Sequence, residues 1–585
     1  MRFIAAEFLH DGDIIQPIPA APRCRFFMCA ICGRYSKTSM RKLRLSPEFW
    51  SALIFTFLLG LYERLLFPVD LTFIPEQMPK NLQLVAQIAC FALVVGYIWI
   101  SLTCRKAVRV AFLALFALAV LGEYGGHYSV GRFSVSDDYD MVFRLIDPTL
   151  YKNALLGFTS QVWPAGAVPI LGYAVLLFGL PGLSQWRNRK LQPNGKFGRF
   201  GVILLLALLL FSALYPVSSG AFRTLSLAAS LRSLTYVGWK YATLYRGPRL
   251  PVETVATVNP QNNIVFIVDE SIRADHLSLN GYSRPTTPYL EQLQHQGVLY
   301  NWGDSASSAT ASTNSNALLL TGINQLPDVS QQTRKMPTIF AYAKAMGYHT
   351  IYLDMQMNRS WLMNAQDFKL VDEWHTEREF SPGGEYQVDT NASTWMYDKL
   401  RSSSGNFIWI NKAGAHFPYL ERLPPGDPLW QPVLSDARYD PADKVALINT
   451  YDNILAYNLE NFFQLLVRPE TLANTTFVYT SDHGQTLSEN GETWPQTGPT
   501  RNEARVPIFI IQADHLKVDT AYKASHQNLF ATLLDLMQVP QENRRFPYAL
   551  SLLRATASLS QPRYYIVGDI NSRLRSWLYN FDGNP

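Results

Sequence analysis

The stretch Thr476-Phe477-Val478-Tyr479-Thr480-Ser481-Asp482-His483-Gly484 decides the fold of the second half of this chain. Its first five residues are apolar or β-branched and predict a buried strand. Asp482 and His483 follow at the carboxyl end of that strand. A carboxylate and an imidazole are poor core residues, but an Asp oxygen and a His nitrogen together suit Zn²⁺. The stretch therefore predicts a metal site at the end of a buried strand.

From residue 260 onward, short apolar runs alternate with helical stretches. The expected strands are 263–268, 349–353, 407–411, 476–480, 506–511 and 564–567. The expected helices lie near 287–297, 311–320, 336–346, 446–467 and 525–538. This alternation predicts an α/β domain with a mostly parallel sheet and helices on both faces. Functional sites of such sheets form beyond the carboxyl ends of strands, where Glu270, His416 and Asp482-His483 all lie in this interpretation.

The first half of the chain has the pattern of a membrane protein. Of the 585 residues, 48% are hydrophobic and 17% charged. Five apolar runs are long enough for helices that cross a bilayer: 48–67, 83–103, 107–124, 166–185 and 200–218. Lys and Arg cluster before the first run and in alternate loops after it, which predicts a cytoplasmic N-terminus. Five crossings would then place the C-terminal half outside the membrane.

The net charge of +5 conceals two halves of opposite sign. Residues 1–249 carry 26 Lys and Arg against 12 Asp and Glu, a net +14, and residues 250–585 carry 25 against 34, a net −9. The basic excess lies beside predicted membrane spans and forms no patch with interleaved aromatics, so nucleic-acid binding is excluded. All five cysteines precede residue 105, so the second half holds no disulfide.

These patterns predict a four-part organisation. The parts are a disordered cytoplasmic tail at 1–47, a five-helix transmembrane domain at 48–218, an amphipathic membrane-surface helix with its linker at 219–259, and a soluble α/β domain at 260–585. The tail has no signal-peptide core, and Met40 is an alternative start to Met1 because a basic cluster and the first span follow it.

Three further residues are candidates for chemistry. Glu270 follows an apolar strand, where its carboxylate can reach a cation, although a capping or ion-pair role is the competing interpretation. Thr310 lies among small polar residues that lead into an apolar helix, and a hydroxyl at a helix N-terminus suits attack on phosphorus. An ordinary helix cap is the alternative there, and Thr313 and several serines compete for the role. His416 follows a third strand and can hold a phosphate oxygen or protonate a leaving group, or merely lie at the surface.

The motifs around these candidates resemble the phosphoethanolamine transferases of the alkaline phosphatase/sulfatase superfamily, which include lipid A-modifying and mobile colistin resistance enzymes. The longest matching run is Glu270–Pro288, Glu-Ser-Ile-Arg-Ala-Asp-His-Leu-Ser-Leu-Asn-Gly-Tyr-Ser-Arg-Pro-Thr-Thr-Pro. Shorter matches lie at 309–311, 414–416, 451–453, 481–484, 489–491, 505–507 and 525–530. The resemblance covers most of the chain from about residue 45.

The resemblance implies a complete site and reaction. Glu270, Thr310, Asp482 and His483 would bind one Zn²⁺, with Mn²⁺ or Mg²⁺ as the less favoured cations. Thr310 would be the nucleophile, and His416 would hold or protonate the substrate phosphate. The family takes phosphoethanolamine from phosphatidylethanolamine onto the threonine, releases diacylglycerol, and passes the group to a glycolipid or glycan. It further implies a membrane-embedded monomer of the bacterial inner membrane with a periplasmic catalytic domain.

The chain departs from the family pattern in three places. A cysteine pair usually flanks the nucleophile, and the corresponding places here are near Ala306 and Asn316. The family often has a histidine shortly after Glu-Asn-Gly, whereas none follows 489–491 here; Gln496 is the expected hydrogen-bonding substitute. Residues 354–361 match too loosely to assign a site for the ethanolamine head.

Two other functions remain open at this point. One is another reaction of the same superfamily, such as phosphoglycerol transfer or phosphodiester hydrolysis. A sulfatase is disfavoured because the chain lacks a Cys/Ser-x-Pro-x-Arg motif. The other is a membrane sensor or scaffold that keeps the fold without catalysis.

Overall fold

The fold was analysed in a computed structural model of the chain. The structure describes residues 46–67, 80–130, 139, 148–179, 225–243, 245, 247–253, 260–323, 329–356, 368–435, 442–489, 495–571 and 576–583. The chain divides into two units, Met1–Ser46 and Pro47–Pro585. The predictions about the N-terminal tail and the start at Met40 fall outside the described residues.

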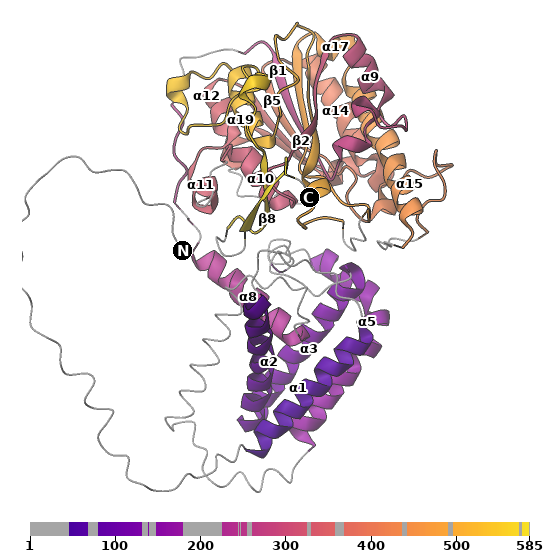
Figure 1. The fold of residues 1–585 in the computed structure, drawn as a ribbon, viewed down its shortest axis with the longest axis vertical. Helices are drawn as coiled ribbons and strands as arrows, with labels where there is room; N and C mark the ends of the chain where they lie inside the picture. The colour runs from indigo at the N-terminus through magenta and orange to yellow at the C-terminus, as the bar shows by residue number, and fades with distance from the viewer. Residues whose placement is uncertain are drawn as a thin grey trace, which may run out of the picture. The chain divides into compact units, whose positions relative to one another are not determined.

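A seven-stranded sheet forms the centre of the α/β domain, in the order β2-β7-β6-β1-β5-β3-β4 (Figure 1). The strands are β1 (Asn263–Asp269), β2 (Leu299–Ala306), β3 (His349–Asp354), β4 (Glu373–Thr376), β5 (Asn406–Asn411), β6 (Thr475–Ser481) and β7 (Arg505–Ile511). Strands β6, β1, β5, β3 and β4 run parallel, whereas β7 and β2 are antiparallel to their neighbours. The predicted α/β domain with a mostly parallel sheet is confirmed.

Helices cover both faces of this sheet because its central strands are apolar on both sides. Val265 and Ile267 of β1 lie in one buried cluster, and Phe266 and Val268 lie in another. The first cluster includes residues of α9 (Pro288–His295), α14 (Val388–Ser402), α15 (Lys444–Ile454) and α16 (Glu460–Leu466). The second includes residues of α10 (Ser312–Thr321), α12 (Ile339–Ala345) and α19 (His526–Leu536). Shorter helices are α11 (Val329–Lys335), α13 (Glu377–Phe380), α17 (Pro469–Leu472) and α18 (Arg501–Ala504).

All six predicted strands are present, and one of them joins a different sheet. Strand β8 (Tyr564–Gly568) pairs antiparallel with β9 (Ser576–Asn580) and lies outside the seven-stranded sheet. Strands β2, β4 and β9 were not predicted from the sequence. Strands β2 and β4 are the sheet's two edges and have polar, partly exposed residues, so they lack a buried strand's apolar run.

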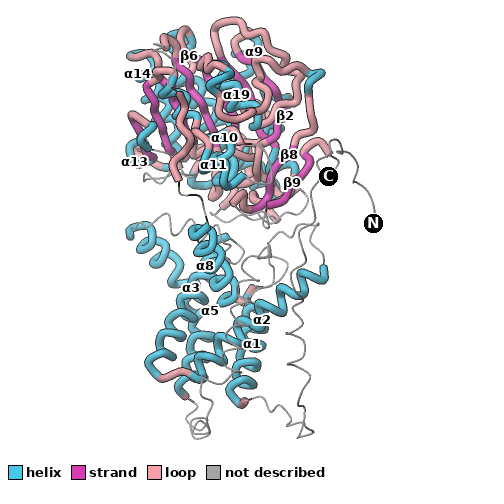
Figure 2. Tube along the Cα trace, turned by 90° about the vertical axis from the view of Figure 1, so that its left-hand side faces the viewer, coloured by secondary structure: helices cyan, strands magenta, loops and turns pink. Residues whose placement is uncertain are grey.

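The first half of the chain is helical in its described part, and the strands lie in the second half (Figure 2). The helices are α1 (Pro47–Leu66), α2 (Lys80–Thr103), α3 (Lys106–Val130), α5 (Pro148–Phe178) and α8 (Ser226–Thr243). Two helical segments among the described residues, Pro47–Leu66 and Lys106–His127, are long and apolar enough to cross a membrane. The apolar segments Gln87–Thr103 and Val162–Phe178 are shorter.

The prediction of five membrane spans is therefore not fully tested by the described helices. The fifth predicted run, 200–218, lies outside the described residues. Leu65 and Leu118 are 73% and 69% exposed, as lipid-facing side chains would be. Arg232 and Lys240 of α8 are buried, and the location of this helix at a membrane surface stays a prediction.

A buried aspartate ties the loop after β1 to helix α15. Asp452 is completely buried, and its carboxylate pairs with His276 Nδ1, Tyr282 OH and Arg284, each at 2.7 Å. The neighbouring Tyr451 donates its hydroxyl hydrogen to the carbonyl oxygen of Ser271 at 2.8 Å. Much of the long motif that begins at Glu270 therefore holds the backbone around the strand end in place.

Replacing Asp452 by Ala should destabilise the fold, because His276, Tyr282 and Arg284 would lose a shared buried partner. Loss of one side of a buried charge pair costs about 3 kcal/mol. Thermal unfolding of the purified variant should show the loss. Glu253→Ala removes an exposed ion pair and should change the free energy of unfolding by less than about 1 kcal/mol. Equal unfolding temperatures for both variants would contradict the structural role of Asp452.

Candidate metal centre

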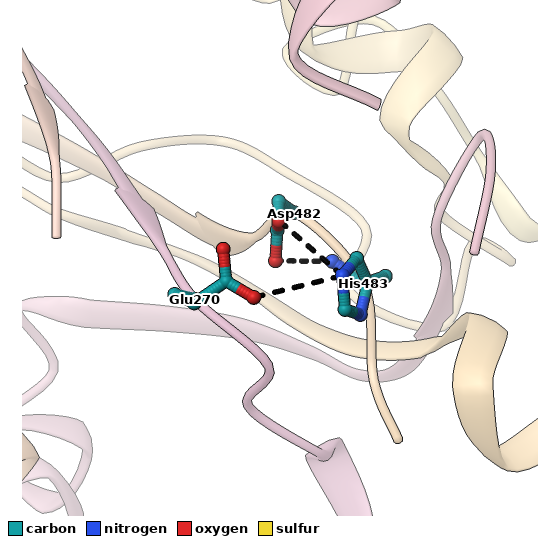
Figure 3. A group of neighbouring side chains, drawn as sticks. All are labelled: Glu270, Asp482 and His483. Atoms are coloured by element: carbon teal, nitrogen blue, oxygen red, sulfur yellow. Dashed lines mark hydrogen bonds and ion pairs between the residues drawn. The ribbon is translucent and has the colours of Figure 1, made fainter. Parts of the chain in front are cut away.

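Two adjacent parallel strands bring the predicted acidic ligands together. Asp269 of β1 is paired in register with Ser481 of β6, so Glu270 and Asp482 are the next residues on neighbouring strands. The Asp482 backbone N–H continues this pairing by donating to the Asp269 carbonyl oxygen at 2.8 Å. The side chains of Glu270, Asp482 and His483 are buried and point toward one another (Figure 3). One potential ligand atom from each lies within 4.8 Å of the other two.

The His483 ring is oriented for a ligand at its Nε2 atom. Its Nδ1 lies 2.6 Å from the carbonyl oxygen of Gly484, which can only accept a hydrogen bond. Nδ1 therefore carries the hydrogen, and the lone pair of Nε2 is left for a cation. Nε2 lies 3.6 Å from a Glu270 oxygen and 3.5 Å from Asp482 Oδ2.

Three neighbouring side chains hold the Glu270 carboxylate in place. Ser271 Oγ donates to Oε1 at 2.7 Å, and Ser312 Oγ and Gln356 Nε2 donate to Oε2 at 3.1 and 3.0 Å. Ser312 Oγ also lies 3.2 Å from His483 Nε2. Both oxygens of Glu270 are thus oriented by hydrogen bonds, as the ligands of metal sites commonly are.

The electrostatics of the group favour a bound cation. Burial, together with the negative charge of Glu270, raises the pKa of Asp482 to about 7. Burial opposes the charged form of His483, but the Asp482 and Glu270 carboxylates together raise its pKa. Two buried carboxylates repel each other unless a positive charge lies between them.

The available donor atoms fit a divalent cation. Two of the predicted ligands have a buried side-chain oxygen without a hydrogen-bond partner among the described residues: Asp482 Oδ2 and Thr310 Oγ1. Buried polar atoms are normally satisfied, so each one without a partner requires a physical explanation. Carboxylate oxygens, an imidazole nitrogen and a hydroxyl together suit Zn²⁺ better than Mg²⁺, which prefers oxygen ligands.

Thr310 lies just before helix α10, and both its backbone N–H and its backbone carbonyl group make hydrogen bonds. Its N–H donates to the Ile566 carbonyl oxygen at 3.2 Å, and its own carbonyl oxygen accepts from the Thr497 N–H at 3.0 Å. The helix begins at Ser312, so the predicted position of Thr310 near a helix N-terminus is confirmed. Because Ser312 contacts Glu270 and His483, this segment adjoins the metal centre. The role of Thr310 as nucleophile stays a prediction.

His416 lies in the loop after β5, the parallel neighbour of β1, and so at the same edge of the sheet. Its side chain is half-buried, and burial, with a contribution from the Arg422 charge, lowers its pKa to about 4. The His416 imidazole is therefore neutral at pH 7. No contact in the described residues assigns its role, which stays a prediction.

The structure adds residues that the sequence did not single out. Gln356 follows β3, so the rule that sites form beyond strand ends could have indicated it. Ser312 is one of several hydroxyl residues in its stretch, and nothing local distinguishes it. Gln496, predicted to replace a missing histidine, lies beside the centre with its Oε1 3.4 Å from Ser271 Oγ. Residues 490–494 of the same segment lie outside the described residues.

Comparisons with known proteins agree with this fold. The Sulfatase family model matches residues 262–539. Phosphoethanolamine transferase EptA of Escherichia coli K12 is 23% identical over 480 residues, covering 76% of this chain and 86% of the relative. Phosphatidylethanolamine transferase Mcr-1 of Escherichia coli is 24% identical over 489 residues, covering 73% and 83%.

One solved structure matches most of the chain. It is the integral membrane protein lipooligosaccharide phosphoethanolamine transferase A of Neisseria meningitidis, with a TM-score of 0.56 and 16% identity. The match covers 84% of this chain and 94% of the other, so the two proteins share a fold.

Residues 262–539 thus resemble a sulfatase-type domain of the alkaline phosphatase/sulfatase superfamily. The chain as a whole is a relative of the phosphoethanolamine transferases, and the family resemblance predicted from its motifs is confirmed.

Removal of a ligand should abolish metal retention. We expect the purified wild-type protein to keep about one equivalent of metal per chain after dialysis, and Glu270→Gln and Asp482→Asn to keep far less. Elemental analysis by mass spectrometry measures this directly. Glu373→Gln is a matched control, because Glu373 lies between two partly exposed histidines away from this site. Retention of a full equivalent by Glu270→Gln would show that this carboxylate is not a ligand.

Proposed function

We propose that this protein is a membrane-bound transferase that moves phosphoethanolamine from phosphatidylethanolamine to an envelope glycolipid or glycan through Thr310. The convergence of Glu270, Asp482 and His483 beside the segment that carries Thr310 is the observation on which the proposal depends. The similarity to phosphoethanolamine transferases over about three quarters of the chain supports the transferred group. One relative, at 22% identity, is a Kdo(2)-lipid A phosphoethanolamine 7''-transferase, which supports a glycolipid acceptor.

Thr310 would exchange the transferred group in two displacements. In the first, Thr310 Oγ1 attacks the donor phosphorus, the P–Oγ1 bond forms and the bond from phosphorus to the diacylglycerol oxygen breaks. The proton of the threonine hydroxyl ends on the released diacylglycerol. In the second, an acceptor hydroxyl or phosphate oxygen attacks the same phosphorus, the P–Oγ1 bond breaks and Thr310 regains a proton. With a hydroxyl acceptor both steps exchange one phosphodiester for another and the acceptor supplies the proton that Thr310 regains, whereas a phosphate acceptor gives a phosphoanhydride.

Glu270, Asp482, His483 and Thr310 would hold Zn²⁺, with Mn²⁺ or Mg²⁺ fitting the imidazole ligand less well. Such a cation, when bound, lowers the pKa of the attacking hydroxyl and offsets negative charge that develops on the phosphate oxygens. The free N–H groups at the start of α10 supply a second positive field at the same place.

The neutral His416 ring suits hydrogen bonding to a phosphate oxygen. With its pKa lowered to about 4, it holds no spare proton at pH 7 but retains one N–H donor. A neutral donor stabilises the phosphate without attracting a second anion into the site. We therefore assign His416 to phosphate positioning.

The same proposal covers location and assembly. The arrangement of Lys and Arg in the sequence supports a multi-pass protein of the bacterial inner membrane, with a cytoplasmic N-terminus and a periplasmic catalytic domain. The similarity in fold to an integral membrane protein agrees with this location. We propose that the protein acts as a monomer with one metal centre per chain.

Thr310→Ala should abolish transfer, because no other hydroxyl would become the nucleophile in its place. Loss of a nucleophile lowers the rate by about 10³-fold or more. The wild-type protein, incubated with phosphatidylethanolamine vesicles, should carry phosphoethanolamine on the peptide that contains Thr310, as measured by mass spectrometry. Thr313→Ala is the matched control, since it removes an exposed hydroxyl three residues away and should keep normal turnover. An adduct on Ser312, or normal turnover by Thr310→Ala, would overturn the assignment.

The lipid that donates phosphoethanolamine and the molecule that accepts it are tested with the same variants. Vesicles of phosphatidylglycerol should give no adduct, and an adduct with that lipid would favour the phosphoglycerol transferase alternative. Envelope lipids and glycans from cells with the wild-type protein should gain phosphoethanolamine relative to cells with Thr310→Ala. Release of free phosphoethanolamine without any modified acceptor would instead indicate a hydrolase.

A further inference from the structure

A buried imidazole, that of His526, links the segment that carries Thr310 to the strand end that carries Asp482 and His483. His526 is the first residue of α19 and is 2% exposed. Its Nδ1 accepts a hydrogen bond from the backbone N–H of Ser308 at 3.1 Å. Its Nε2 lies 2.8 Å from the carbonyl oxygen of Ser481 and 3.1 Å from Thr480 Oγ1. Ser308 is two residues before Thr310, and Ser481 immediately precedes the metal-ligand pair.

The two backbone partners, the Ser308 N–H and the Ser481 carbonyl oxygen, permit only one tautomer of the His526 ring. A backbone N–H can only donate, so Nδ1 must be the acceptor, and a backbone carbonyl can only accept, so Nε2 must carry the hydrogen. Protonation of Nδ1 would place one N–H against another inside the protein. Burial independently lowers the pKa of His526 to about 3, so the neutral ring persists at any physiological pH.

The His526 ring connects two chain segments that are not paired with each other in the sheet. In the central sheet, β7 separates β2, which leads to Ser308, from β6, which ends at Ser481. The segment after β2 is instead held by backbone contacts with other elements: Ser307 N–H donates to the Ala504 carbonyl oxygen at 2.8 Å, and Ile566 of β8 bonds to Ser308 and Thr310 at 2.9 and 3.2 Å. None of these contacts joins the segment to the end of β6. The second half of the chain has no cysteine, so no disulfide holds this segment either.

We propose that His526 is a positioning residue that sets the distance between the Thr310 segment and the Asp482-His483 pair by bridging Ser308 to Ser481. This inference rests on the proposed function only in taking Thr310 as the nucleophile. Glu270, Asp482 and His483 are held by other contacts, so a change at His526 moves the Thr310 segment and leaves three of the four proposed metal ligands in place. A displacement of about 1 Å at a reacting atom lowers rates by roughly 10²-fold.

Two substitutions of His526 by amide residues distinguish the contributions of the two hydrogen bonds that the ring makes to Ser308 and Ser481. His526→Asn places its Oδ1 near the position of Nδ1 and keeps the acceptor for Ser308. His526→Gln places its amide nitrogen near the position of Nε2 and keeps the donor to Ser481. We expect the rate of phosphoethanolamine loading onto Thr310 in a single turnover to fall about 10²-fold in His526→Ala. His526→Asn should recover much of this loss, and His526→Gln should recover less, because the Thr310 segment is held by the acceptor.

Each variant is compared with the wild-type protein for loading rate, metal content and unfolding temperature. His515→Asn is the matched control, since His515 is exposed, and it should load at the wild-type rate. Unchanged metal content with the order wild type, Asn, Gln, Ala in loading rate supports the proposal. A wild-type loading rate in His526→Ala, or equal losses in all three variants that follow their unfolding temperatures, would overturn it.

The state of the ring gives a readout that does not depend on the reaction. The ¹⁵N chemical shifts of His526, assigned by comparison with His526→Asn, should show an unprotonated Nδ1 and a protonated Nε2. The opposite tautomer or an imidazolium would overturn the bridging arrangement. If the wild-type protein itself shows no loading, the proposed function fails, whereas the ring state still decides whether His526 bridges the two segments.

Discussion

Parallel pairing of β1 with β6 is the constraint on which the candidate metal centre depends. The register that pairs Asp269 with Ser481 makes Glu270 and Asp482 neighbours without any contribution from their side chains. A shift of the register by one residue would turn one of the carboxylates toward the opposite face. The apolar residues that bury these strands therefore also determine where the ligands lie. Fold and site share one set of backbone hydrogen bonds.

A buried ion pair lies at the end of β1, where Asp269 is paired with Ser481. Lys412 Nζ is 2.6 Å from Asp269 Oδ2, both side chains are completely buried, and Tyr479 OH donates to the same oxygen at 3.0 Å. Asp269 Oδ1 accepts from the Glu270 N–H at 3.0 Å, which fixes the peptide that carries the first ligand. Buried ion pairs contribute little net stability, because desolvation offsets their attraction. This pair is better explained by the fixed orientation that it gives to Glu270.

The sequence predicted those features that local pattern determines. Strands with continuous apolar runs were predicted, and Asp482 and His483 were singled out because charged residues directly after such a strand have few structural uses. Glu270 was singled out by the family resemblance, since a capping or ion-pair role explains a lone Glu as well, and the structure brings the three together. The polar edge strand β4 and the hairpin partner β9 were not found, because edge strands lack the buried pattern. The choice between Thr310 and Ser312 could not be made from local sequence, since both precede or begin the same helix. Their different contacts, with the hydroxyl of Thr310 unpartnered and that of Ser312 on Glu270, arise only in the folded chain.

The surroundings of Thr310 explain why its role lies beyond local pattern. Its segment is held by Ile566, Thr497 and His526, which are about 190 to 260 residues distant along the chain. Strand β8, which contains Ile566, lies beyond the matched family region 262–539. The Thr310 backbone is therefore positioned partly by a segment outside the region that the family model matches. A substitution in β8 can therefore shift Thr310 without contacting Glu270, Asp482 or His483.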